Sequence, residues 1–301
     1  MTRIFVFPGQ GSQKVGMGEG LFPGFAGEVA AADDVLGYSI QQLCLLDPEQ
    51  KLGQTEFTQP ALYVVNTLSY LKRLRDTGET PDFVAGHSLG EYNALFSAGV
   101  FDFATGLRLV QKRGELMARV TDGGMAAVLG LGVERVREIL RDSGSGGLDI
   151  ANLNTPAQVV ISGPAEDVRK AQEIFQGAGA KMFVPLKVSG AFHSRYMETA
   201  RMEFDAFLAG FQFSAPTIPV VANVTAAPYG TGQARELLSR QITSPVRWAE
   251  SIQFLLRQPK PQFEEIGPGK VLTGLIRQIV TTQESGVRIQ NKKQADGEER
   301  R

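Results

Sequence analysis

The sequence of 301 residues contains very little cysteine and histidine, and this scarcity limits the chemistry open to it. With Cys44 as the only cysteine, an intramolecular disulfide is excluded, which is typical of proteins from a reducing cytosol. The only histidines, His87 and His193, are too far from each other and from Cys44 to suggest a metal-ligand cluster. We therefore predict a cytoplasmic protein without a metal site.

Strong net charge and long apolar runs are also lacking. The formal charge of −1 and the pI near 6.2 give no general attraction to nucleic acid or to an anionic membrane. No apolar run approaches the roughly 18 residues that span a bilayer, and Met1–Arg3 is too short for a signal peptide before the first expected strand. We expect a soluble protein that binds neither nucleic acid nor a membrane.

Expected strands alternate with expected helices in two parts of the chain, 1–123 and 189–282, which we assign to one discontinuous domain. Strands are expected at Ile4–Phe7, Phe83–Ala85 and Val220–Val224. Helices are expected at about 60–76 with a proline at the start, from Glu91, and at about 104–119, 195–209 and 271–280. This alternation, with glycine-rich turns, predicts a parallel-sheet α/β core.

Residues 124–188 show a different order, β-α-β-β-α-β, which is typical of a ferredoxin-like subdomain. The elements are expected at Met125–Leu131, Val133–Asp142, Leu148–Asn152, Gln158–Ser162, Glu166–Ala178 and Lys181–Leu186. Residues 283–301 are polar and highly charged, and we predict a disordered tail there.

The pentapeptide Gly86–Gly90, Gly-His-Ser-Leu-Gly, lies between an expected strand and an expected helix. A G-x-S-x-G motif at such a junction turns the chain sharply and presents the serine hydroxyl at the N-terminus of the helix. Ser88 is therefore the predicted nucleophile. The alternative is an ordinary glycine-flanked turn whose serine only caps the helix.

A serine needs a base to be nucleophilic at neutral pH, and histidine is the usual one. His193 lies about 105 residues beyond Ser88, across the insert, so only the fold can bring them together. We favour His193 over His87 as the base, because neighbouring side chains diverge at such a turn. The alternative is that His193 is a hydrogen-bonded structural histidine.

Gln10 follows the first expected strand, at the sheet edge where open α/β sheets bind their ligands. Its flanking glycines let the backbone approach a substrate closely. We predict that the main-chain N–H groups of Gln10 and Leu89, the residue after the serine, form an oxyanion hole. A glycine-rich turn without a role is the alternative.

Arg113 lies on the helix expected at about 104–119. Because arginine binds carboxylates through paired hydrogen bonds, a buried arginine near the serine would select acyl groups with a free acid. From the residues alone, a solvated surface arginine is the better interpretation.

Seven segments, in family order from residue 4 to about 280, resemble the malonyl-CoA:acyl-carrier-protein transacylase family. They are Phe7–Gln13, Thr58–Ala61, Gly86–Glu91, Gln111–Gly114, Ala191–Ser194, Ser244–Trp248 and Glu265–Gly269. The resemblance implies an α/β-hydrolase-like core with an inserted ferredoxin-like subdomain, which the strand and helix pattern predicts independently.

The resemblance also implies roles for single residues. Ser88 would be the nucleophile and His193 its base. Family members lack the acid of a triad, and a main-chain carbonyl orients the histidine instead; the matching residue is Gln241. Arg113 would bind the malonyl carboxylate. The oxyanion hole and the pocket would involve Gln10, Leu89, Gln59, His87 and Phe192.

The implied reaction moves malonyl from malonyl-CoA to Ser88, releases CoA, and then moves malonyl to the phosphopantetheine thiol of an acidic acyl carrier protein. It needs no cofactor of its own. Leu89 and Phe192 resemble the malonyl-selecting rather than the methylmalonyl-selecting versions of their motifs. The segments 37–40 and 55–66 resemble free-standing acyltransferases of trans-acyltransferase polyketide synthases, with fatty acid synthesis as the close alternative.

Two other functions compete with transfer. The first is an acyl hydrolase that uses Ser88 and His193 with water as the acceptor. Arg113 argues against it, because such relatives tend to lose this arginine. The second is a carrier-binding scaffold without activity, against which the intact set of Ser88, Gln10, Arg113 and His193 argues.

Overall fold

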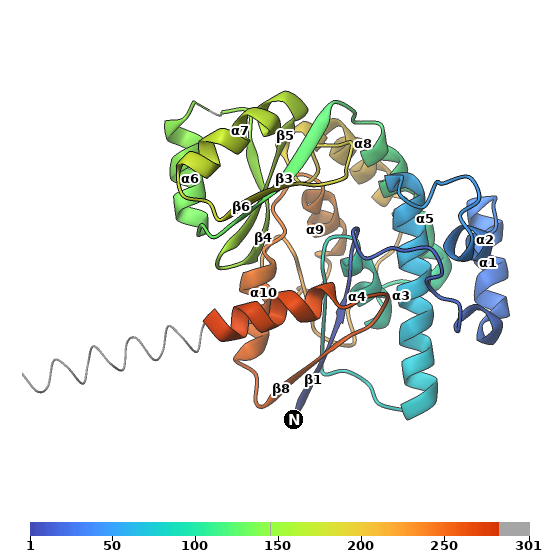
Figure 1. The fold of residues 1–301 in the computed structure, drawn as a ribbon. Coiled ribbons are helices and arrows are strands. Elements are labelled where there is room, and N and C mark those ends of the chain that lie inside the picture. Colours follow the sequence, from blue (N-terminus) through green and yellow to red (C-terminus); the bar gives the residue numbers. More distant parts are fainter. Residues whose placement is uncertain (145, 283–301) are drawn as a thin grey trace, which may run out of the picture.

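The computed structural model describes residues 1–144 and 146–282, which contain two four-stranded sheets (Figure 1). The first sheet is parallel, with the strand order β7-β2-β1-β8. Its strands are β1 (Thr2–Phe7), β2 (Phe83–Gly86), β7 (Val220–Val221) and β8 (Pro261–Glu265). The chain therefore leaves this sheet after β2 and returns to it at β7.

The second sheet lies between these two points and is antiparallel, with the order β4-β5-β3-β6. Its elements are β3 (Gly123–Leu129), α6 (Val133–Asp142), β4 (Asp149–Thr155), β5 (Gln158–Pro164), α7 (Ala165–Gly177) and β6 (Met182–Pro185). Both the element order and the strand order are ferredoxin-like. The predicted ends of these elements differ from the observed ones by at most about three residues.

The remaining helices surround the parallel sheet (Figure 1). They are α1 (Ala26–Leu36), α2 (Ile40–Leu45), α3 (Thr55–Thr77), α4 (Gly90–Ser97), α5 (Phe103–Ala118), α8 (Glu198–Leu208), α9 (Ala234–Gln241), α10 (Trp248–Leu256) and a helical segment at 271–282. Two short 3₁₀ turns lie at Phe22–Gly24 and Arg195–Met197. Within the described ranges, none of these helices combines the length and the apolarity that crossing a bilayer requires.

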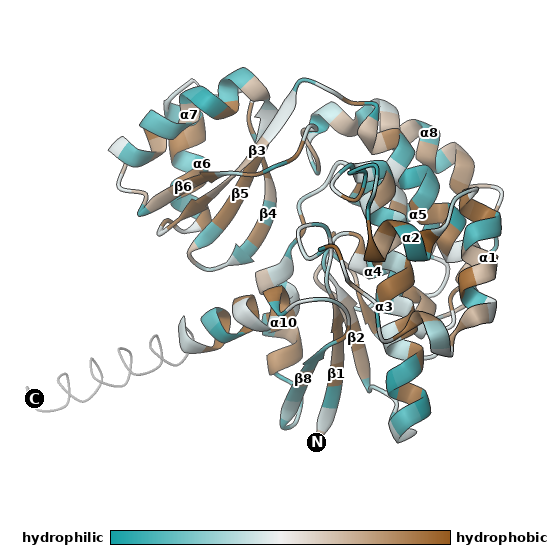
Figure 2. Cartoon of the chain, turned by 45° about the vertical axis from the view of Figure 1, so that its right-hand side comes forward, coloured by the Kyte–Doolittle hydropathy of each residue, from teal (hydrophilic) through white to brown (hydrophobic). Residues whose placement is uncertain are grey.

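Alternate residues of β1 belong to two separate hydrophobic clusters. Phe5 and Phe7 pack into the large cluster that includes α3, α4 and α5. Ile4 and Val6 pack into the cluster formed with α10 and the helical segment at 271–282. Because side chains of a strand alternate between faces, a parallel sheet covered by helices on both sides buries every residue of such a run. In Figure 2, β2 and most of β1 are hydrophobic, whereas the edge strand β8 is mostly hydrophilic.

Two predictions about the parallel part were wrong in detail. The helix expected at about 60–76 begins at Thr55, so Pro60 lies inside it rather than at its start. A proline near the N-terminal end removes only one early hydrogen bond, which the buried packing of α3 outweighs. The strand expected at Val220–Val224 ends at Val221, because the backbone of Asn223 bonds instead to the Glu91 side chain.

The two sheets are joined near the functional residues. Strand β4 pairs with Val246, through the bonds from Leu153 N–H to the Val246 carbonyl and from Val246 N–H to the Ala151 carbonyl. This short parallel pairing fixes the antiparallel sheet over the carboxyl ends of β1 and β2. The tail predicted at 283–301 lies outside the described residues.

Candidate active site

Ser88 lies in a tight turn between β2 and α4, as the pentapeptide predicts. Its φ of 50° is a left-handed conformation that is uncommon for a residue with a side chain. The flanking glycines permit the close chain crossing: a Cβ on Gly86 would lie 1.9 Å from the Gly90 carbonyl carbon, and one on Gly90 would lie 2.0 Å from the Phe7 carbonyl oxygen. The turn therefore presents the Ser88 hydroxyl at the sheet edge where β1 and β2 end.

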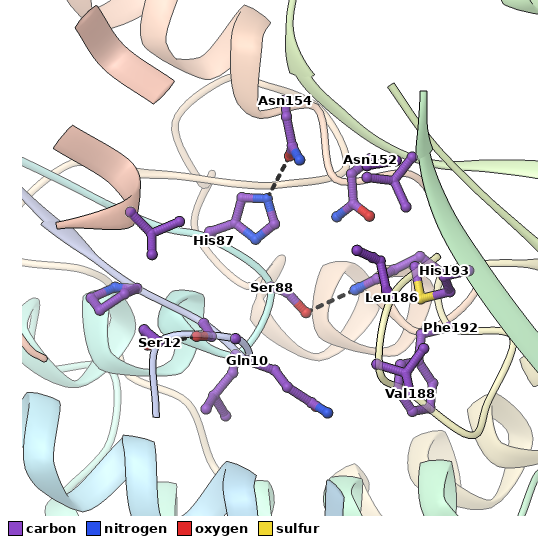
Figure 3. A pocket seen from close by; sticks show the side chains of 18 of the residues that line it. Gln10, Ser12, His87, Ser88, Asn152, Asn154, Leu186, Val188, Phe192 and His193 are labelled. Atoms are coloured by element: carbon purple, nitrogen blue, oxygen red, sulfur yellow. Dashed lines mark hydrogen bonds between the residues drawn. The ribbon is translucent and has the colours of Figure 1, made fainter. Parts of the chain in front are cut away.

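His193 lies directly beside Ser88, despite their separation in the chain. The Ser88 Oγ is 2.7 Å from His193 Nε2 (Figure 3), and His193 Nδ1 is 2.8 Å from the main-chain carbonyl oxygen of Gln241. A carbonyl only accepts, so Nδ1 carries the proton and Nε2 is left as the acceptor for the Ser88 hydroxyl. The arrangement gives a serine, a base and an orienting carbonyl.

The environment of His193 keeps its imidazole neutral. Burial, followed by the nearby positive charge of Arg113, lowers the pKa of His193 to about 3, although its bond to Gln241 acts in the opposite direction. A neutral imidazole is the form that accepts a proton from a hydroxyl. The base is therefore in the correct protonation state at pH 7.

Arg113, expected on the surface from the residues alone, is only 1% exposed and faces the serine. Its NH2 group is 3.1 Å from Ser88 Oγ and 2.9 Å from Gln241 Oε1, and its NH1 group is 2.7 Å from Gln59 Oε1. Its Nε has no partner among the described residues. Burial lowers its pKa from the ordinary value, but an arginine keeps its charge.

The loop that carries Gln10 lies against the turn that carries Leu89, because Gly9 packs on this turn. A Cβ on Gly9 would lie 2.3 Å from the His87 carbonyl oxygen and 3.6 Å from the Leu89 nitrogen. Neither the Gln10 N–H nor the Leu89 N–H donates a hydrogen bond to another described residue. The Gln10 side chain lines the cavity and bonds to Thr55.

These residues line a cavity of about 260 Å³ between the two sheets. Phe192 and Met117 contribute part of its apolar wall, and Figure 3 shows Leu186 and Val188 on the same side as His193. The far wall comes from the antiparallel sheet, with Asn152 and Asn154 of β4 among its residues.

His87 points away from Ser88, as predicted, and contacts the antiparallel sheet. Its Nε2 is 2.9 Å from Asn154 Oδ1 (Figure 3), and its ring packs edge-on against Trp248. Burial lowers the pKa of His87, so the ring is neutral and Nε2–H donates to the Asn154 carbonyl oxygen. His87 therefore holds the cavity wall in place rather than acting on Ser88.

The structure adds residues that sequence reasoning missed. The side chain of Asn223 accepts from Ser88 N–H at 2.7 Å and donates to the Gly86 carbonyl at 2.6 Å, which fixes the turn. Glu91 is fully buried below it. The one signal in the sequence is position, because Glu91 directly follows the pentapeptide and Asn223 follows a strand at the same sheet edge.

Comparisons with known proteins agree with this geometry. The acyl transferase domain family matches residues 4–295. A polyketide biosynthesis malonyl CoA-acyl carrier protein transacylase of Bacillus velezensis is 56% identical over 276 residues, which cover 91% of this chain and 96% of that protein. A malonyl CoA-acyl carrier protein transacylase of Synechocystis is 44% identical over 280 residues, covering 92% of this chain and 93% of the relative.

Solved structures give the same result. A malonyl CoA-acyl carrier protein transacylase of Burkholderia pseudomallei has a TM-score of 0.91 at 51% identity, covering 93% of this chain and 98% of that one. A malonyl-transacylase solved in complex with a type II polyketide synthase acyl-carrier protein has a TM-score of 0.89 at 40% identity, covering 94% of each chain. The chain therefore belongs to the acyl transferase family, as one of its malonyl-CoA:acyl-carrier-protein transacylases.

Proposed function

We propose that this enzyme transfers malonyl from malonyl-CoA to the phosphopantetheine thiol of an acyl carrier protein, through an ester on Ser88. In the first half, Ser88 Oγ attacks the thioester carbonyl carbon while its proton moves to His193 Nε2. The C–S bond then breaks, and the CoA sulfur leaves with the proton from His193. In this proposal, the N–H groups of Gln10 and Leu89 stabilise the oxyanion of this step.

In the second half, the carrier thiol gives its proton to His193 and its sulfur attacks the ester carbonyl. The C–O bond breaks, and Ser88 takes the proton back. The Gln241 carbonyl holds the imidazole in one orientation during both proton transfers. In this proposal, Ser88 is the nucleophile, His193 transfers the protons and Arg113 binds the substrate carboxylate. The proposed reaction therefore needs no metal, and no cofactor beyond the pantetheine that both substrates carry.

The unneutralised charge of Arg113 is the observation that carries the malonyl assignment. Its partners are the neutral groups of Gln59, Gln241 and Ser88, and it forms no salt bridge with a carboxylate of the described residues. A buried cation with no carboxylate in contact is costly, and a substrate carboxylate placed beside the serine would supply that contact. Among acyl groups, malonyl fits this requirement and acetyl does not.

The comparisons support a role in polyketide synthesis, since the polyketide transacylase of Bacillus velezensis is 56% identical and the transacylase of Synechocystis 44%. The complex of a similar transacylase with its acyl-carrier protein supports a carrier protein as the acceptor. Nothing in the comparisons favours the hydrolase alternative. The cytoplasmic location stays a prediction.

Intact-protein mass spectrometry tests the proposal. The enzyme is incubated briefly with malonyl-CoA, methylmalonyl-CoA or acetyl-CoA, and then with a holo-carrier protein. We expect a malonyl adduct on Ser88 that moves to the carrier. Rapid release of free acid without transfer would instead indicate the hydrolase.

A further inference from the structure

A buried carboxyl group that the proposed reaction does not use lies beneath the site. Glu91, on α4, is fully buried and forms no salt bridge with a described residue. Three donors converge on it instead: Asn223 N–H at 3.0 Å and the Tyr229 hydroxyl at 2.6 Å reach Oε1, and the Gln241 side-chain amide reaches Oε2. Burial raises the pKa of Glu91 to about 7, although these three hydrogen bonds act in the opposite direction. The two carboxyl oxygens are the acceptors for all three donors.

Through Gln241, this carboxylate is connected to Arg113. The Gln241 NH₂ group donates to Glu91 and to the Ser88 carbonyl, while its Oε1 accepts from Arg113 at 2.9 Å. The amide therefore lies between the buried carboxyl group and the buried guanidinium, so that Arg113 bonds to the Gln241 carbonyl oxygen and not to Glu91. If the amide were reversed, its NH₂ would face the guanidinium, donor against donor.

Through Asn223, the same carboxylate is connected to the nucleophile. Glu91 holds the Asn223 main-chain N–H, and the Asn223 side chain holds the N–H of Ser88. The main-chain carbonyl of Gln241 in turn orients His193. One buried carboxylate thus connects to all three groups around the reacting carbonyl.

We propose that Glu91 is a positioning residue for acyl selection: its carboxyl oxygen accepts from the Gln241 NH₂ and so fixes the direction of that amide, which holds Arg113 in place for the malonyl carboxylate. The inference rests on the proposed function. It concerns which acyl group the site accepts rather than whether Ser88 is acylated.

Replacement by the amide isostere shows why two acceptor oxygens matter. In the native protein, the Asn223 N–H and the Gln241 NH₂ each donate to one oxygen of Glu91. In Glu91→Gln, one of these two oxygens is replaced by an NH₂ group, which cannot accept. Either orientation leaves one donor facing another donor. Reversal of the Gln241 amide relieves this conflict at Glu91 but disrupts the contact with Arg113.

The test is the ratio of single-turnover acylation rates for malonyl-CoA and acetyl-CoA, followed by intact-protein mass spectrometry. We expect Glu91→Gln to lower this ratio at least tenfold. Tyr229→Phe is the matched control: it removes one donor from the same carboxylate but leaves the bond to Gln241, and we expect it to change the ratio less than twofold. In a Gln241→Met background, Glu91→Gln should have no further effect on the ratio.

The outcomes separate this inference from the proposed function. If the wild-type enzyme forms no malonyl adduct, the proposed function fails. If it does, and Glu91→Gln slows both substrates equally, Glu91 is only structural and the inference is overturned. Should Glu91→Gln not fold, Gln241→Met alone decides, because a retained malonyl preference in that variant would also overturn the inference.

Discussion

The two sheets of this enzyme differ in how the polar side chains around them are arranged. At the carboxyl ends of the parallel strands, a connected set of buried polar side chains surrounds Ser88, including Glu91, Arg113, Asn223 and Gln241. The antiparallel sheet packs against α6 and α7 through an apolar cluster, and the ion pairs of these helices, such as Arg137–Glu134, are solvent-exposed. Figure 2 shows the hydrophilic outer faces of the two helices.

The difference indicates that the two sheets have different roles. Buried polar networks are costly when incomplete but hold side chains in one geometry when every group is paired, and the parallel part carries the groups that act on the acyl carbonyl. The antiparallel sheet contributes a wall to the cavity, through β4 and the contact between Asn154 and His87. Changes in the first region should therefore alter the chemistry, and changes in the second should alter stability or substrate affinity.

The largest effect is expected for Ser88→Ala in the parallel part. Loss of the attacking oxygen should reduce acyl transfer by about 10⁴-fold or more and abolish the adduct seen by mass spectrometry. Ser97→Ala is the matched control, since Ser97 lies on the same helix, α4, and its side-chain hydroxyl donates to the Ala94 carbonyl, away from the site. A malonyl adduct on the Ser88→Ala protein would show that the nucleophile is another residue.

The next comparison uses one glycine from each region. In Gly90→Ala, the new Cβ would lie 2.0 Å from the Phe7 carbonyl oxygen, so we expect a loss of stability of about 3 kcal/mol. Gly177→Ala, at the exposed end of α7, meets no atom within 4 Å and should raise stability by about 0.5–1 kcal/mol. Urea unfolding measures both, and equal effects would contradict the close crossing at the turn.

The two histidines give a third comparison, because His193 contacts Ser88, whereas His87 contacts Asn154 of the antiparallel sheet. The pKa of His193 is lowered to about 3, so its imidazole should stay neutral from pH 8 down to pH 5. In Arg113→Ala the nearby charge is lost, and the pKa of His193 should rise. NMR titration of the two histidines measures this, with His87 as internal reference. An unchanged His193 would show that Arg113 does not act on the base.

The smallest effect is expected for the cavity wall that the antiparallel sheet contributes. Asn154→Ala removes the hydrogen-bond partner of His87, and the loss of one such bond, about 1 kcal/mol, should weaken the binding of malonyl-CoA and acetyl-CoA about fivefold each. Steady-state KM values for both substrates test this. A change in the ratio between the two substrates would mean that the wall takes part in acyl selection.

The sequence predicted the turn around Ser88 because a local pattern encodes it: two glycines, a serine and the flanking strand and helix. It also predicted the ferredoxin-like order from alternating apolar periods alone. The pairing of Ser88 with His193 followed from there being only two histidines. Local patterns thus predicted the fold class, and the small number of histidines predicted the pairing of Ser88 with His193.

The buried state of Arg113 could not be derived from its helix, because burial depends on what packs against that face. Glu91 and Asn223 were missed for a similar reason. Their partners, such as Gln241 at a separation of 150 residues from Glu91, meet only in the folded chain. The early start of α3 and the short β7 also reflect tertiary contacts that override local signals.

The central claim, that a buried and unneutralised arginine selects the malonyl group, is tested most directly by Arg113→Ala. The measurement is the ratio of single-turnover acylation rates for malonyl-CoA and acetyl-CoA, with Arg119→Ala as control, since Arg119 is exposed and paired with Glu203. We predict that Arg113→Ala lowers this ratio on the order of 100-fold, about 3 kcal/mol, and that the control leaves it unchanged. Equal losses with both substrates would contradict the account.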